Sequence, residues 1–173
     1  MQFASSTPEH THGLGVRLGR LAQPGDVLLL QGEMGSGKTV LAQGVGEGLA
    51  VREPVTSSSY VLMAEYHGRL TLYHADLFRL DDPAQVAELA LEEVAATGVL
   101  IVEWPERAWG ELPAEHLLVV IEETEGEETE SCRKLTLTAR GARYTARGRR
   151  YDELLEALAN DGSQREESAR AGG

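Results

Sequence analysis

The sequence predicts a single α/β domain over residues 1–159, with a mostly parallel central sheet, antiparallel additions and flanking helices. One observation is that short apolar runs alternate with segments of helical periodicity. Another is that a glycine-rich stretch joins the apolar run 27–30 to a helical pattern. A chain of 173 residues is long enough to build one core, and it contains no internal repeat.

The first third of the chain predicts a helix, a strand and a second helix. Residues 8–21 have a partial apolar face, and Ser6 or Thr7 precedes them as a cap. The apolar run 27–30 predicts a buried strand. The next helix, about 38–49, contains three glycines, each of which costs about 1 kcal/mol against alanine. We therefore expect close packing, against the sheet, to hold this helix.

The remaining elements are predicted from apolar periodicity and turn residues. In chain order they are a hairpin of strands 60–66 and 70–75, a helix from 81 to about 94, a buried strand at 98–102, strands at 117–121 and 135–138, and a closing helix at 151–159. Residues 160–173 are polar and are predicted to form a disordered tail.

Composition narrows the class of protein. The chain has no apolar stretch near the roughly 20 residues of a membrane span and no signal-peptide pattern at its start, and Cys132 is its only cysteine. We therefore expect a cytoplasmic protein without a membrane partner. A net charge of -12 argues against tight, non-specific binding to DNA or RNA. The acidic run 122–130 and the basic stretch 133–150 are interpreted as solvated segments, with a basic patch for a partner or RNA as the alternative.

The glycine-rich stretch carries the strongest chemical signal. The octet at 32–39 fits the pattern G-x-x-x-x-G-K-[ST] between a strand and a helix, the context of a phosphate-binding loop. Backbone N–H groups and the helix N-terminus favour an anion there. The sequence thus predicts a P-loop NTPase-like domain that binds a nucleoside triphosphate. The binding residues predicted from this loop are Glu33, Met34, Gly35, Ser36, Gly37, Lys38 and Thr39.

A nucleotide site of this kind needs a carboxylate on a neighbouring strand to hold Mg²⁺ or its water. Acids that directly follow apolar runs are candidates, because ligands gather at the carboxyl ends of strands. Asp76, Glu103 and Glu122 meet this condition. Glu103 follows the most apolar strand and is the preferred metal ligand together with Thr39, with Asp76 as a second acid. Glu122 begins the acidic run and is interpreted as a loop residue.

The kind of nucleotide follows partly by elimination. The N-K-x-D and D-x-x-G motifs of guanine-specific GTPases are absent, and so is the L-S-G-G-Q signature of transport ATPases. A small-molecule kinase remains an alternative, although the chain offers no long insert for a lid. A non-hydrolysing module that senses nucleotide is a second alternative.

Several short motifs, taken together, resemble the bacterial TsaE (YjeE-like) ATPases over residues of about 5 to 140. The matching segments are the octet 32–39, Val-Thr-Ser-Ser-Ser-Tyr at 55–60, His-Ala-Asp-Leu-Phe-Arg at 74–79, Leu-Glu-Glu at 91–93 and Val-Glu-Trp-Pro-Glu-Arg at 102–107. The last of these, combined with the segment at 74–79, is the most specific.

The resemblance implies a role for further residues. It implies ATP and Mg²⁺ as cofactors, with Lys38, Asp76, Glu103 and Trp104 as catalytic residues. Thr11 would lie near the adenine, and Arg133 matches a basic position near the nucleotide.

The resemblance also implies a cellular role. The family's ATPase supports a threonylcarbamoyl transferase complex of TsaD- and TsaB-type proteins, which forms threonylcarbamoyladenosine at position 37 of tRNAs that read ANN codons. The chain would hydrolyse ATP weakly on its own and would contact tRNA only indirectly.

The chain departs from the family pattern at two places. Ser58 and Ser59 stand where the family has proline and threonine; Ser59 keeps a hydroxyl for phosphate or water, but the loop loses the residue that fixes φ. Val40 stands where threonine is frequent and removes a hydroxyl. We expect slower or weaker handling of ATP as a result.

Overall fold

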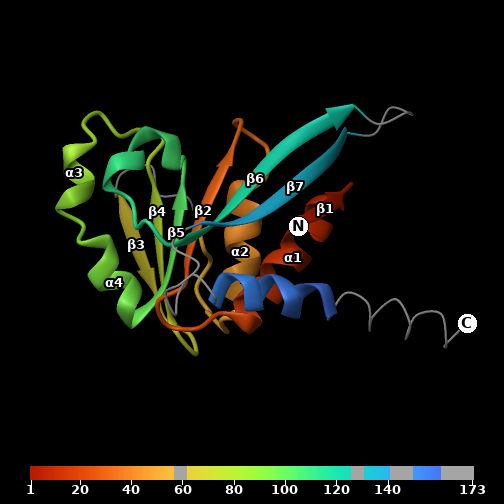
Figure 1. Cartoon of the computed structure of the whole chain (residues 1–173), viewed down its shortest axis with the longest axis horizontal. Coiled ribbons are helices and arrows are strands. Elements are labelled where there is room, and N and C mark those ends of the chain that lie inside the picture. Colours follow the sequence, from red (N-terminus) through yellow and green to blue (C-terminus); the bar gives the residue numbers. More distant parts are fainter. Residues whose placement is uncertain (57–61, 126–130, 141–149, 161–173) are drawn as a thin grey trace, which may run out of the picture.

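The computed structural model describes residues 1–56, 62–125, 131–140 and 150–160 of the chain (Figure 1). Its strands are β1 (Gln2–Ser5), β2 (Val27–Gly32), β3 (Met63–Tyr66), β4 (Thr71–Asp76), β5 (Gly98–Glu103), β6 (His116–Glu125) and β7 (Ser131–Arg140). Its helices are α1 (Pro8–Leu21), α2 (Lys38–Gly48), α3 (Ala84–Ala87), α4 (Leu91–Thr97) and a helix at 150–160, with short 3-10 turns at Pro105–Arg107 and Trp109–Glu111.

The described strands form one sheet in the order β1-β7-β6-β2-β5-β4-β3. The four central strands, β6, β2, β5 and β4, are parallel, while β3, β7 and β1 pair antiparallel at the two sides. This confirms the predicted fold class, including the hairpin of β3 and β4. Strand β1 was not predicted, because its four residues contain one large apolar side chain and no alternation to mark a strand.

Alternation along the strands divides the core into two faces. On one face, Leu28 and Leu30 of β2 pack with α1, α2 and the helix at 150–160. On the other face, Val27 and Leu29 pack with α3 and α4. Side chains keep alternating between the two faces up to the ends of the strands. This alternation therefore determines which polar residues at the strand ends face α2.

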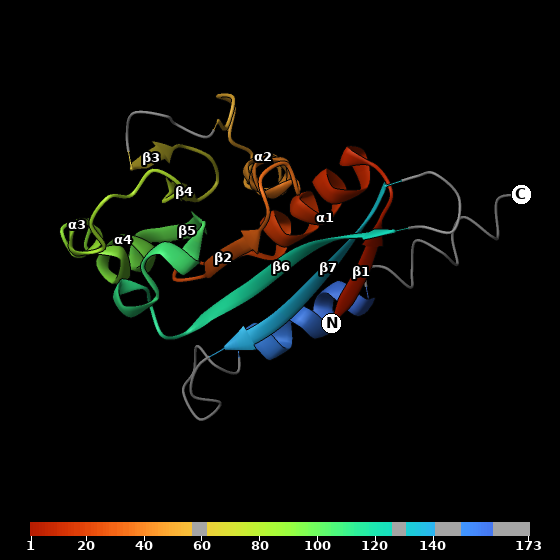
Figure 2. The ribbon, with the colours of Figure 1, turned by 90° about the horizontal axis from the view of Figure 1, so that it is seen from above.

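Helices α1 and α2 lie side by side on the first face (Figures 1 and 2). Their contact is backbone against backbone: a Cβ added at Gly44 would lie 2.1 Å from the carbonyl oxygen of His12, and one added at Gly15 would lie 2.3 Å from that of Leu41. Only glycine permits this approach. The glycine-rich helix is therefore held by close packing, as expected, but at Gly44 its partner is α1 rather than the sheet.

Helix α1 spans the predicted residues, and Thr7 caps it by accepting a hydrogen bond from the His10 N–H. The single helix predicted from 81 to about 94 is wrong, because Ala90, with φ of 48°, separates α3 from α4. Val86 and Leu91 are both buried in the second core face. In one continuous helix they would point about 140° apart, and the break lets both reach the sheet.

The acidic run at 122–130 begins within a strand rather than in a loop. Residues 122–125 belong to β6 and pair with 131–134 of β7, and the part of the run at 126–130 lies outside the described residues. Glu122 is exposed on this strand and does not line the pocket described below.

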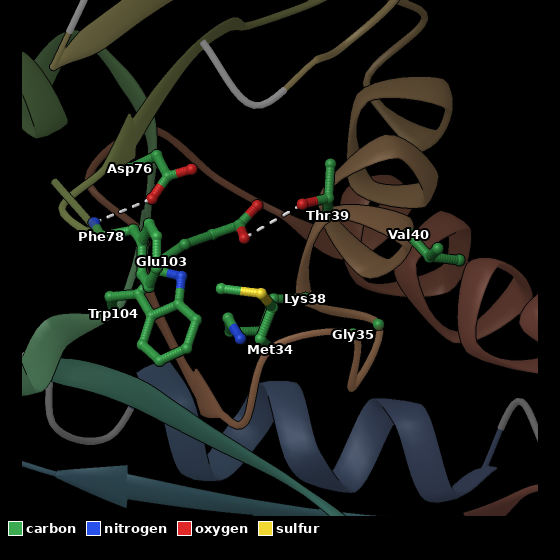
Figure 3. A pocket seen from close by; sticks show the side chains of 10 residues that line it. Met34, Gly35, Lys38, Thr39, Val40, Asp76, Phe78, Glu103 and Trp104 are labelled. Carbon is green, nitrogen blue, oxygen red and sulfur yellow. Dashed lines mark hydrogen bonds between the residues drawn. The ribbon is translucent and has the colours of Figure 1, made fainter. Parts of the chain in front are cut away.

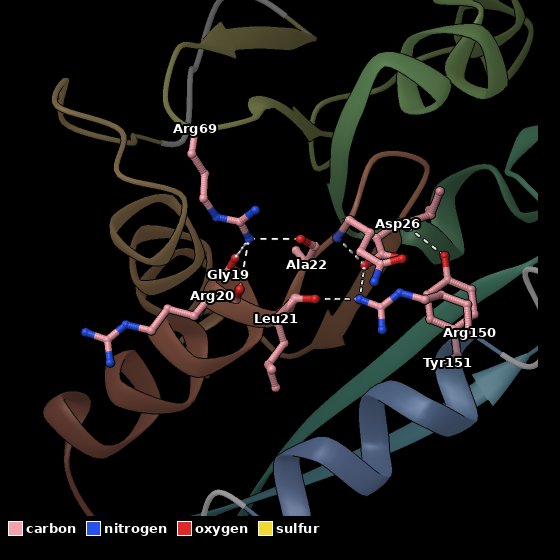
Figure 4. Close-up of polar contacts among 10 residues, drawn as sticks. Gly19, Arg20, Leu21, Ala22, Asp26, Arg69, Arg150 and Tyr151 are labelled. Carbon is pink, nitrogen blue, oxygen red and sulfur yellow. Dashed lines mark hydrogen bonds and ion pairs between the residues drawn. The ribbon is translucent and has the colours of Figure 1, made fainter.

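The helix at 150–160 is tied to the start of β2 (Figure 4). The Arg150 guanidinium donates to the Leu21 carbonyl and lies 2.9 Å from a carboxylate oxygen of Asp26, and the Val27 N–H donates to the Tyr151 hydroxyl. On the other side of this junction, Arg69 donates to carbonyl groups at the end of α1. No helix within the described ranges has both the length and the apolar character to cross a membrane.

Candidate functional site

A pocket of about 320 Å³ opens where β2, β4 and β5 end, against the first turn of α2 (Figure 3). Loops at this end of a parallel sheet commonly bind ligands. The lining residues come from the glycine-rich loop (residues 32–39) and its helix and from the ends of the two neighbouring strands: Met34, Gly35, Gly37, Lys38, Thr39, Val40, Asp76, Phe78, Glu103 and Trp104.

The glycine-rich loop has the backbone shape of an anion-binding turn. Gly35 and Gly37 have φ of 81° and 107°, which glycine adopts without strain. Within the described residues no side chain caps the N-terminus of α2, and the buried Ser36 hydroxyl has no hydrogen-bond partner. A buried hydroxyl and a free helix N-terminus are groups that a phosphate can satisfy. The loop therefore fits the predicted phosphate.

Lys38 is turned back onto the loop that carries it. Its ammonium donates to the carbonyl oxygens of Gly32 and Glu33, at 2.7 and 2.8 Å, and lies 3.8 Å from the centre of the Trp104 ring. Burial lowers the pKa of Lys38, and nearby carboxylates, above all Glu103, oppose this. The ammonium is thus partly desolvated and has no carboxylate at hydrogen-bond distance among the residues that the structure describes, which favours a phosphate ligand.

Thr39 and Glu103 meet across the pocket. The Thr39 hydroxyl donates to Glu103 Oε2 at 3.1 Å, although the two residues are 64 positions apart (Figure 3). Glu103 is only 2% exposed, and its other oxygen, Oε1, lies 2.9 Å from His74 Nε2. The pair joins the start of α2 to the end of β5. It provides the hydroxyl and carboxylate oxygens that Mg²⁺ prefers.

Asp76 lies beside Glu103, since the two are register partners in β4 and β5. Asp76 is the last residue of β4, and its Oδ1 accepts a hydrogen bond from the Phe78 N–H at 3.0 Å, just after the strand ends. Within the described ranges, no group of three or more histidine, cysteine or acidic side chains is placed to hold a metal alone. This donor set fits Mg²⁺, which usually takes one or two carboxylates together with phosphate oxygens and water.

Trp104 closes one side of the pocket. Its backbone is left-handed, with φ of 60°, directly before Pro105, and its N–H donates to the Leu30 carbonyl. A proline disfavours the right-handed helical conformation in the residue before it. The indole ring lies 4.9 Å from the Phe78 ring and over the Lys38 ammonium, so it lies beside the glycine-rich loop.

The other predicted binding residues lie around the loop or outside the described part. Thr11 and Arg133 approach Gly37 from α1 and β7: a Cβ there would lie 3.7 Å from Thr11 Cγ2 and 3.9 Å from Arg133 Cδ. Neither lines the pocket, and Thr11 is buried with its hydroxyl 2.8 Å from that of Ser5. Ser59 is outside the described residues.

Sequence reasoning missed two residues of the site. Phe78 lines the pocket, and His74 reaches Glu103 from the neighbouring strand. The available signal was alternation, since His74 lies two residues before Asp76 in a strand and so shares its face. Val40 lines the rim, and its side chain points away from Glu103 (Figure 3).

The parallel sheet, the glycine-rich loop at the end of a central strand and the helix that starts at Lys38 define a P-loop NTPase-like fold. Residues 5–134 match the model of the family described as "Threonylcarbamoyl adenosine biosynthesis protein TsaE". Because this match covers most of the chain, the chain belongs to the TsaE family.

Relatives and a solved structure agree with this assignment. A protein named tRNA threonylcarbamoyladenosine biosynthesis protein TsaE in Bacillus subtilis is 36% identical over 146 residues, which cover 83% of this chain and 89% of that protein. Proteins of the same name are 38% identical in Streptomyces coelicolor, covering 76% and 91%, and 41% identical in Treponema pallidum, covering 65% and 84%. The crystal structure of Bacillus subtilis YdiB superposes with a TM-score of 0.74 at 32% identity and covers 94% of this chain and 95% of that one.

Proposed function

We propose that the chain binds ATP with Mg²⁺ in the pocket and hydrolyses it. The observation that carries the proposal is the hydrogen bond between Thr39 and Glu103 beside the Lys38 ammonium. A hydroxyl that follows the loop lysine, together with a carboxylate at the end of a neighbouring strand, is the ligand set of Mg²⁺ in nucleotide hydrolases of this fold.

Each group that lines the pocket has a proposed role that fits its position. The N–H groups around Gly35 and Gly37 would hold phosphate oxygens, and Lys38 would exchange its two carbonyl partners for them. Thr39 and Glu103 would hold the metal. When bound, Mg²⁺ neutralises charge on the phosphate oxygens. Asp76, next to Glu103, is in place to orient water.

The cellular role follows from the relatives, whose names assign them to threonylcarbamoyladenosine biosynthesis on tRNA. We propose that the chain supports this modification as an accessory ATPase of a threonylcarbamoyl transferase complex. A net charge of -12 favours contact with that complex over direct contact with tRNA.

The proposal is tested by measuring phosphate release from ATP. The chain is assayed alone and together with the TsaD- and TsaB-type proteins (the transferase pair) of its own organism. We expect slow release alone and faster release with the pair. Lys38→Ala and Glu103→Ala should each reduce release by about 100-fold or more, because each removes a group that stabilises charge on the phosphates. His67→Ala, an exposed change in the turn after β3, is the matched control.

Two results would contradict the proposal. Unaltered release in both pocket variants would show that hydrolysis occurs elsewhere. Tight ATP binding by the wild type without any release, alone or with the pair, would indicate a nucleotide sensor instead.

A further inference from the structure

His74 is a buried polar residue that the proposed function leaves without a task. It lies in β4 and is 3% exposed. Leu72, two residues earlier, belongs to the core face that packs against α2, so alternation directs His74 to that same face. In β5, Ile101 belongs to the same core face, and Glu103, two residues later, therefore also points to that face. Two neighbouring strands thus deliver a histidine and a glutamate to the side of the sheet on which α2 begins.

The three side chains form a continuous chain of hydrogen bonds. His74 Nε2 lies 2.9 Å from Glu103 Oε1, and the Thr39 hydroxyl donates to Glu103 Oε2 at 3.1 Å. A carboxylate that binds a metal is ionised and only accepts hydrogen bonds, so in that state of the site His74 Nε2 is the donor of this contact. Each oxygen of Glu103 therefore has one fixed donor, one from β4 and one from α2.

Glu103 needs such fixation more than an aspartate would. A glutamate side chain has one more rotatable bond, and ordering it costs more conformational entropy. A buried carboxylate that loses a donor is also strongly disfavoured, which pushes it to move. With Oε1 held by His74, the remaining oxygen is directed toward Thr39 and the pocket.

We propose that His74 is a positioning residue: it holds Glu103 in the orientation in which Oε2, together with Thr39, receives the metal of the bound nucleotide. This inference rests on the proposed function. It makes a distinct claim, however, because His74 would change how strongly a divalent ion improves nucleotide binding and would leave metal-free binding to the glycine-rich loop unchanged.

The test compares His74→Leu, which removes the donor, with His74→Gln, which keeps an N–H donor on a flexible chain. The control is Tyr73→Phe, which removes a hydroxyl contact to Thr97 from the adjacent residue of β4, on the opposite face. For each variant, the affinity for a fluorescent non-hydrolysable ATP analogue is measured in EDTA and in Mg²⁺. Binding of Mn²⁺ in the presence of the analogue is followed by electron paramagnetic resonance.

We expect the ratio of the affinities with and without Mg²⁺ to fall about tenfold in His74→Leu, the lower end of the effect of losing a partner that orients a metal ligand. Mn²⁺ affinity should fall in parallel. The affinity in EDTA should stay at the wild-type value, and His74→Gln and Tyr73→Phe should keep most of the wild-type ratio.

A wild-type ratio in His74→Leu would overturn the positioning role, and so would a loss in His74→Gln as large as in His74→Leu. Failure of the proposed function looks different, because the wild type itself would then bind no analogue or gain nothing from Mg²⁺, and the inference would fall with it.

Discussion

At the scale of single residues, the Lys38 ammonium contacts groups of the protein itself where a ligand would otherwise bind it. Its ammonium is bonded to two carbonyls of its own loop and covered by Trp104. Neutral carbonyls satisfy its hydrogen bonds but do not balance its charge. A phosphate would do both, so the surroundings of Lys38 favour an anionic ligand.

The pH dependence of ATP binding tests this view of Lys38. Burial lowers its pKa below the ordinary 10.5, so the ammonium is lost at a lower pH than in an unfolded chain. ATP affinity should therefore fall by about 10- to 100-fold as pH rises through that lowered pKa, since a charge-assisted hydrogen bond is lost. Titration calorimetry at increasing pH measures the fall, and a parallel fall in Lys38→Met would contradict the assignment.

The same shift has a consequence for folding. Because the folded chain disfavours charged Lys38, this residue lowers stability below its folded pKa, and the cost disappears as pH rises toward 10.5. A bound phosphate would offset this cost in stability. ATP should therefore raise the free energy of unfolding in urea more at neutral than at alkaline pH.

The sequence could mark residues of the glycine-rich loop, Glu103 and Asp76 as candidates, because a local pattern and the end of an apolar run identify them, and the fold brings Lys38, Glu103 and Asp76 to one pocket. It could not reveal that His74 touches Glu103, since that contact depends on which strands are neighbours. The curl of Lys38 onto Gly32 and Glu33 is likewise a property of the folded loop.

Between elements, the contact of α1 with α2 explains the glycines that make α2 a poor helix in isolation. Gly44 meets the His12 carbonyl, and Gly15 meets that of Leu41. The sequence predicted tight packing of this helix against the sheet, and the structure adds α1 as the partner at Gly44. The break at Ala90 and strand β1 escaped prediction for the same reason, because tertiary contacts decide them.

A matched pair of glycine substitutions tests this contact. Gly44→Ala places a Cβ 2.1 Å from a backbone oxygen and should lower the free energy of unfolding by about 1–3 kcal/mol or more, because the helices must separate. Gly13→Ala, in α1 but facing open space, should raise it by up to about 1 kcal/mol. Urea unfolding measures both, and equal effects of the two changes would contradict the packing account.

For the molecule as a whole, the helix at 150–160 is part of the core although the family match ends at residue 134. Tyr151, Leu154 and Leu158 are at most 1% exposed, and Arg150 pairs with Asp26. The helix therefore braces the start of β2, whose other end carries the glycine-rich loop.

Two truncations test this role. A chain that ends at residue 149 should lose several kcal/mol of stability, because each of the three buried side chains contributes about 1.5–3 kcal/mol. A chain that ends at residue 160 should unfold at the same urea concentration as the full chain, as expected for a polar tail. An unchanged midpoint in the shorter chain would show that the helix is dispensable.

The most direct measurement of the whole account is the threonylcarbamoyladenosine content of tRNA in the native organism, determined by mass spectrometry of total tRNA nucleosides. The chromosomal copy is replaced by Glu103→Ala, by Lys38→Ala or by Gly13→Ala as a control outside the pocket. We predict a marked loss of the modified nucleoside in the two pocket variants and a wild-type level in the control. Wild-type levels in both pocket variants, with the variant proteins present at normal abundance, would contradict the claim that nucleotide turnover in this pocket supports the modification.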